Sequence, residues 1–79
     1  AAMDNPNTRW EWYVANVKTS LNARGGPGTN YDIVTTLPKG TAIDDIIAKE
    51  GVWWHCELEE GEQVWLHSKF LGKRQVPHD

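Results

Sequence analysis

Cysteine is almost absent from this sequence of 79 residues, in which Cys56 is the only one. A single thiol excludes an internal disulfide, and it excludes zinc sites and redox motifs built from cysteine pairs. Long apolar runs are missing as well, since no stretch approaches the roughly 20 residues that cross a bilayer. The opening residues, AAMDNPNTRW, have neither the basic start nor the apolar middle of a signal peptide. We therefore expect no membrane insertion.

A surplus of positive charge is also lacking. Eight lysines and arginines stand against eleven aspartates and glutamates, which gives a net charge of −3. A chain of this charge offers no electrostatic basis for holding a polyanion, so nucleic acid is not an expected partner.

Convincing helical patterns are absent, and the segments between Gly and Pro turns have the composition of strands. These segments are WEWYVANV, LNAR, YDIVTTL, TAIDDIIAKE, VWWHCEL and QVWLH, the last two flanking an acidic turn. TAIDDIIAK is also compatible with one or two helical turns. The pattern predicts one all-β domain, a small antiparallel barrel of five or six short strands.

The tryptophans Trp53 and Trp54 are adjacent, and strand parity gives them different positions. Alternate side chains of an extended strand point to opposite faces. One face is wholly apolar and suits the core: Trp54, Cys56 and Leu58. The opposite face carries Trp53 beside polar residues: His55, Glu57 and Glu59. We expect Trp53 to lie outside the core, and in the return strand, where parity is less decisive, we expect Leu66 to lie inside.

Two longer segments follow in this order: LNARGGPGTNYDIVTTLPKGT and GVWWHCELEEGEQVWLHSKFLG. Together they resemble the bacterial Src-homology-3 domain from about Val17 to Leu71, in the order and at the spacing of that family. The resemblance implies a Src-homology-3-like barrel over residues 11–72, with a short 3-10 turn at His67 to Phe70. Residues 1–10 and 73–79 have little apolar content, and we expect both segments to be flexible.

The resemblance also implies a ligand-binding groove. Phe70 takes the place of the family's groove tyrosine, His67 that of a proline, and Trp53 that of the first tryptophan of a pair. The loop RGGPGTN precedes a tyrosine near the binding face. The implied ligand-binding residues are Trp53, Phe70, Tyr31, Asn30, His55 and His67. Because the groove proline and an acidic specificity loop are missing, polyproline is not the implied ligand.

Residues that could carry out catalysis or bind a metal do not form a complete set. RGGPGTN lacks the Lys-Ser/Thr ending and the following helix of a phosphate-binding loop. The three histidines, His55, His67 and His78, lack the further ligands of a zinc site, and adjacent His55 and Cys56 point to opposite faces. The glutamates of the acidic turn are open to water, where catalytic pKa shifts are not expected. We expect no enzymatic activity, cofactor or metal.

The sequence therefore predicts a monomeric, non-catalytic binding module. The resemblance implies that it recognises cell-wall peptide, from a peptidoglycan stem or cross-bridge, and targets a parent envelope protein or hydrolase outside the cytoplasm. The acidic turn favours a ligand with free amines. A protein–protein interaction adaptor in the bacterial envelope is the alternative function. A stand-alone enzyme with a site of histidines and glutamates is a third hypothesis.

Overall fold

The computed structural model describes residues 8–77, which form an all-β domain. Its elements are β1 (Thr8–Val14), β2 (Ser20–Arg24), β3 (Ile33–Pro38), β4 (Ala42–Glu50), β5 (Trp53–Leu58), β6 (Gln63–His67), the 3-10 turn η1 (Ser68–Phe70) and β7 (Leu71–Pro77). The predicted all-β class and the short 3-10 turn near the C-terminus are both confirmed.

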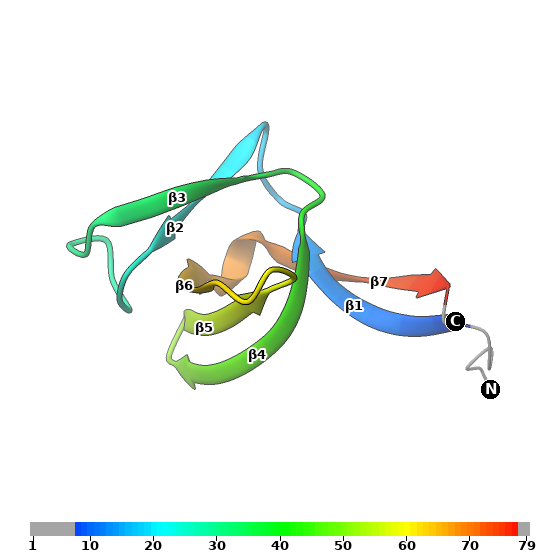
Figure 1. The fold of residues 1–79 in the computed structure, drawn as a ribbon. Helices are drawn as coiled ribbons and strands as arrows, with labels where there is room; N and C mark the ends of the chain where they lie inside the picture. Colours follow the sequence, from blue (N-terminus) through cyan, green and yellow to red (C-terminus); the bar gives the residue numbers. More distant parts are fainter. Residues whose placement is uncertain (1–7, 78–79) are drawn as a thin grey trace.

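All seven strands belong to one antiparallel sheet, in the order β3-β2-β6-β5-β4-β1-β7. The sheet curls so that β2 and β3 lie across the interior from β4 and β5 (Figure 1). Gly61 has a φ of 92° in the turn between β5 and β6, a left-handed conformation that lets the chain reverse within a few residues. The resulting half-barrel is compatible with a small Src-homology-3-like barrel.

Nine of the ten residues of the segment TAIDDIIAKE form strand β4, from Ala42 to Glu50, and not helical turns. Its pairing with β5 is interrupted by two bulges, one between Ile43 and Asp45 and one between Ile46 and Ala48. A bulge adds a residue to one strand and shifts the alternation of its side chains. Ile43 is therefore buried in the core, and Ile46, three residues later, is partly buried and packs against it.

Strand β7 was not predicted, and with it the described part of the chain has seven strands where five or six were expected. It pairs with β1 along the whole length of both strands, from Thr8 opposite Pro77 to Val14 opposite Leu71. The paired strands thus extend beyond the predicted barrel limits of 11–72, and residues 73–77, expected to be flexible, form part of a strand. Residues 8–10, also expected to be flexible, belong to β1, and the remaining residues of the two segments, 1–7 and 78–79, lie outside the described residues.

The mostly polar composition of residues 73–77 concealed this strand. Arg74 donates a hydrogen bond from Nε to Oε2 of Glu11 at 2.8 Å, and its guanidinium lies 4.3 Å from the ring centroid of Tyr13. Lys73 Nζ lies 5.2 Å from the ring centroid of Trp12. Cross-strand pairs of this kind stabilise a two-stranded ribbon without a continuous apolar face. They exist only once β1 and β7 are neighbours, so local hydrophobicity does not reveal them.

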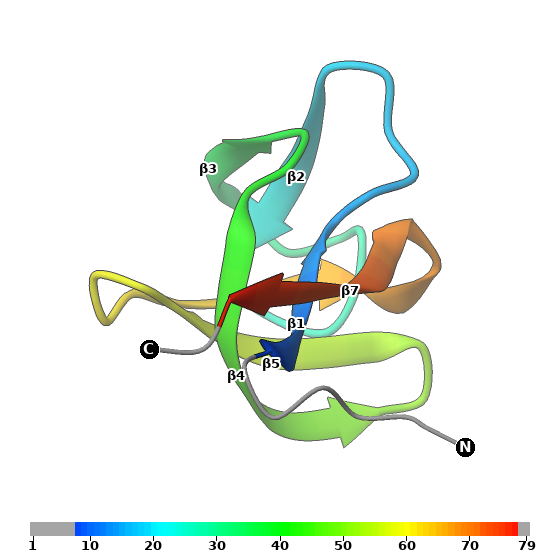
Figure 2. The ribbon, with the colours of Figure 1, turned by 90° about the vertical axis from the view of Figure 1, so that its right-hand side faces the viewer.

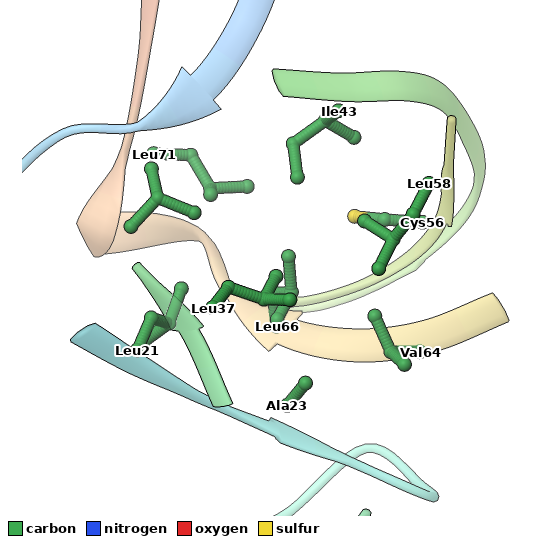
Figure 3. Packing of buried hydrophobic residues seen from close by; sticks show 10 residues of the cluster. Leu21, Ala23, Leu37, Ile43, Cys56, Leu58, Val64, Leu66 and Leu71 are labelled. Atoms are coloured by element: carbon green, nitrogen blue, oxygen red, sulfur yellow. The ribbon is translucent and has the colours of Figure 1, made fainter. Parts of the chain in front are cut away.

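The core occupies the space enclosed by the curled sheet, where buried side chains from several strands meet (Figure 3). Its members are Val14, Leu21, Ala23, Leu37, Ile43, Cys56, Leu58, Val64, Leu66 and Leu71. Leu66 is fully buried, as expected, and Val64 is 2% exposed, so both face inward from β6. Strand parity therefore holds in β6 as well as in β5.

Trp54 faces the core, as parity predicted, but it is only partly buried. Its ring meets that of Trp12 edge-on, with the centroids 5.0 Å apart. The ammonium group of Lys49 lies over the same ring, 4.2 Å from its centroid. The predicted face is thus right, whereas complete burial is not observed, because the two indoles and the lysine form a layer beside the buried core.

Candidate ligand-binding groove

A groove of about 320 Å³ lies between β2 and the end of the β5–β6 hairpin that leads into η1. Strand β2 and the segment before it line one wall, and β5, β6 and η1 line the other. Three of the lining side chains are aromatic: Trp53, His67 and Phe70. Ligand sites occupy about 300–1,000 Å³, so this groove suits a short segment of a ligand.

The three aromatic rings form a row along one wall. Trp53 and His67 are directly opposed in the β5–β6 pairing, and their ring centroids lie 5.3 Å apart at an interplanar angle of 65°. Phe70 follows, with its centroid 5.8 Å from that of His67 at an angle of 69°. Edge-to-face contacts at such separations are favourable, so the rings hold one another in place.

His67 also begins the 3-10 turn. Its Nδ1 accepts a hydrogen bond from the Lys69 backbone N–H at 3.2 Å and so caps η1. Because Nδ1 is an acceptor, the neutral imidazole carries its proton on Nε2. The ring can therefore donate one hydrogen bond to a ligand while it continues to cap the turn.

Tertiary hydrogen bonds hold η1 at the edge of the groove. The Phe70 carbonyl accepts hydrogen bonds from the backbone N–H groups of Ala15 and Asn16 at 2.8 and 3.1 Å. The side-chain amide of Asn16 donates to the Lys69 carbonyl at 3.0 Å. A turn of three residues has little stability of its own, so these bonds to the segment after β1 fix the positions of Lys69 and Phe70.

Arg24 ends β2 and holds the loop of residues 25–32. Its Nη1 donates to the carbonyl oxygens of Thr29 and Tyr31 at 3.1 and 2.9 Å. Within the loop, the Tyr31 ring lies directly against the backbone of Gly26, and a side chain at position 26 would collide with the ring. The glycines of RGGPGTN therefore allow close packing within the loop, and Arg24 fixes the loop to the sheet.

Half of the six predicted ligand-binding residues line the groove, namely Trp53, His67 and Phe70. Asn30 and Tyr31 belong to the loop that contributes Thr29 to the groove, but they are not among its lining side chains. Tyr31 is 44% exposed. That any of these residues contacts a ligand stays a prediction.

The remaining predicted residue, His55, is also not among the lining side chains. It shares the outward face of Trp53 but lies two residues further along β5, opposite Trp65. The two rings stack with centroids 4.7 Å apart and an interplanar angle of 5°. Strand parity predicted the face of His55 correctly. The register between β5 and β6 places His67 opposite Trp53, and it places His55 opposite Trp65.

Two cationic residues of the groove, Arg24 and Lys69, were missed in the sequence. Parity could have indicated Arg24, because Leu21 and Ala23 are buried and Ser20, Asn22 and Arg24 alternate with them. No comparable signal existed for Lys69, which lies in η1, where strand parity does not apply.

A second hollow, of about 200 Å³, lies at the turn of the β5–β6 hairpin. Three glutamates of the turn, Glu59, Glu60 and Glu62, line it together with apolar residues that include Leu37 and Leu58. The turn, in yellow, and η1, in orange, lie on opposite sides of the molecule in Figure 2. The acidic turn was expected to favour amine ligands, but it does not line the groove.

Metal-binding groups do not cluster in the part of the chain that the structure describes. Within residues 8–77, histidine, cysteine, aspartate and glutamate nowhere form a group of three that could hold a metal ion. Cys56 is fully buried, and its Sγ donates to the Trp54 carbonyl at 3.5 Å.

No helix in the described range is long and apolar enough to cross a membrane.

Comparisons with known proteins relate the chain to parts of longer enzymes. No family model matches the sequence. The chain is 34% identical over 53 residues, 67% of its length, to the putative N-acetylmuramoyl-L-alanine amidase YrvJ of Bacillus subtilis, and 35% identical over 54 residues, 68% of its length, to the probable endopeptidase p60 of Listeria welshimeri. It spans about a tenth of the length of each relative. A match of this extent is consistent with a small accessory domain within a longer protein.

Proposed function

We propose that the domain is a non-catalytic module that binds cell-wall peptide and targets a parent envelope protein or hydrolase to the wall. The observation that carries the proposal is the row of Trp53, His67 and Phe70 in an open groove. Aromatic rings provide a large apolar contact area at low conformational cost, and such residues dominate the energy of many binding sites.

The relatives support a role in the cell wall. One is named a putative N-acetylmuramoyl-L-alanine amidase and the other a probable endopeptidase. A domain that covers a tenth of such an enzyme is suited to positioning it on its substrate. We assign the domain to the bacterial Src-homology-3 type on its sequence motifs and its curled sheet, and an extracytoplasmic location follows from that assignment.

The geometry of the groove suits an extended peptide. The aromatic wall offers apolar surface, while Ser20, Asn22 and His67 offer polar groups for backbone amides. The groove is formed by segments distant in sequence, β2 and η1, which the fold holds in fixed positions. A preformed site of this kind loses little free energy to ordering when the ligand binds.

The experiment is a co-sedimentation assay with purified Bacillus subtilis sacculi freed of teichoic acid. Trp53→Ala should weaken binding roughly thirtyfold, because an aromatic anchor is worth about 2 kcal/mol. Trp10→Ala is the matched control, since Trp10 is 55% exposed in β1 and does not line the groove. If the sacculi leave all of the unmodified protein in the supernatant, the proposal fails.

A protein–protein adaptor is the second candidate, and the edge strand β3 favours it. Ile33 and Val34 of this strand are 49% and 58% exposed, and among residues 8–77 only β2 pairs with β3. Exposed apolar side chains on an unpaired strand edge are suited to a protein partner. An adaptor would bind an envelope protein, Val34→Lys would weaken that binding, and sacculi would not retain the domain.

A further inference from the structure

We infer that the groove selects peptides that carry a free carboxylate, which Lys69 and Arg24 bind while the adjoining carbon atoms lie on Trp53 and Phe70. This inference rests on the proposed function, and it specifies the class of peptide that the groove takes.

The first reason is the distribution of charge between the two hollows. The chain as a whole has more carboxylates than cations, and its net charge is −3. The groove nevertheless has two permanent cations and no carboxylate among its lining residues, whereas the second hollow has three glutamates and no cation. Because complementary charge favours the correct partner and like charge rejects the wrong one, the groove favours an anionic ligand and disfavours an amine.

The second reason is that both cations keep their charge available. The ion pairs found among residues 8–77 both involve Glu11, on β1, and neither includes Arg24 or Lys69. Arg24 uses Nη1 to hold two loop carbonyls, which fixes the guanidinium and leaves its other N–H donors for a ligand. A guanidinium held in this way binds a carboxylate without first losing its own freedom of rotation.

The third reason is that charge and apolar surface are adjacent at η1. Lys69 Nζ lies 5.0 Å from the ring centroid of Phe70, the next residue in the chain. The neighbouring His67 adds the Nε2–H donor described above. A carboxylate held by Lys69 therefore has its attached carbon atoms beside an aromatic ring, which is the arrangement expected for a residue at a free peptide terminus or for a short acidic side chain.

Chemical amidation of the sacculi tests the inference. Carbodiimide and ammonia convert free carboxylates of the wall peptide into neutral amides and leave the rest of the polymer intact. We expect the domain to bind amidated sacculi at least tenfold more weakly than untreated sacculi. Non-specific attraction cannot produce this result, because an acidic protein is repelled less by a polymer that has lost negative charge.

Three variants locate the effect in the groove. Lys69→Gln should weaken binding to untreated sacculi roughly threefold, as for an exposed ion pair, and Arg24→Gln roughly tenfold. Neither variant should bind amidated sacculi more weakly than the unmodified protein does. Lys39→Gln, in the turn after β3 and outside both hollows, should have no effect. Lys69→Gln keeps the inference testable if loss of Arg24 disturbs the loop that it holds.

The possible outcomes separate the two proposals. Equal binding to untreated and amidated sacculi overturns the carboxylate inference and leaves the proposed function in place. Tighter binding to amidated sacculi also overturns the carboxylate inference and leaves the proposed function in place. If neither preparation is bound, both proposals fail.

Discussion

The two ends of the β5–β6 hairpin are close in sequence but differ in chemistry. Trp53 and His67 belong to a groove with two cations, and Glu59 and Glu62 belong to a separate acidic hollow. The length of β5 separates them, roughly 17 Å at about 3.3 Å per residue. Charges at that distance are screened in physiological salt, where the Debye length is about 8 Å. The charge of the groove is therefore set by residues from β2 and η1, and not by the acidic turn that follows Trp53 in the sequence.

The largest expected effect separates the adjacent residues Trp53 and Trp54 at the groove end of the hairpin. Trp54→Ala removes a ring that packs on the core and on Trp12, and we expect a loss of about 3 kcal/mol in the free energy of unfolding. Trp53→Ala removes a ring that faces the groove, and a loss of about 1 kcal/mol is expected. Urea unfolding midpoints measure both. A larger loss for Trp53→Ala would mean that the groove wall supports the fold more than the inner face does.

Cys56 lies between the two ends and reports whether the hairpin stays closed. Burial raises the pKa of its thiol from 9.0 to about 12, because the thiolate would lose its hydration. The unfolded chain ionises first, so the free energy of unfolding should fall as the pH rises from 9 toward 12, and Cys56→Ala should lack this part of the loss. At pH 8, iodoacetamide should alkylate the native thiol roughly 100-fold more slowly than the urea-unfolded one. Rapid alkylation of native protein would show that the hairpin opens.

The smallest expected effect is at the acidic turn. A triple variant in which Glu59, Glu60 and Glu62 are replaced by Gln should bind sacculi within about twofold of the unmodified protein at 0.15 M salt, because screening isolates the turn from the groove. Lys69→Gln, measured in parallel, shows how much binding to sacculi changes when a charge inside the groove is removed. A change of tenfold or more in the triple variant would show that the turn contributes to ligand binding, and the contrast between the two ends would be lost.

Strand parity predicted the faces of the hairpin well but did not predict the membership of the groove. Cys56, Leu58 and Leu66 face inward and Trp53 faces outward, as their positions in the sequence indicate. His55 shares the outward face but stacks on Trp65 outside the groove. Parity is a property of one strand, whereas the groove depends on the register between strands.

The sequence by itself determined the all-β class, the inward and outward faces of β5 and, through a motif of the family that it resembles, the terminal 3-10 turn. The alternation of apolar and polar side chains, the turn residues and a short motif are local features. Because the backbone has few allowed conformations, such features suffice to fix local structure. Tertiary structure alone decided that β7 pairs with β1, that His67 lies beside Trp53, and that Arg24 and Lys69 both line one groove. These outcomes depend on the curl of the sheet and on contacts between residues far apart in the chain, where charges and hydrogen bonds become partners only after the strands have assembled.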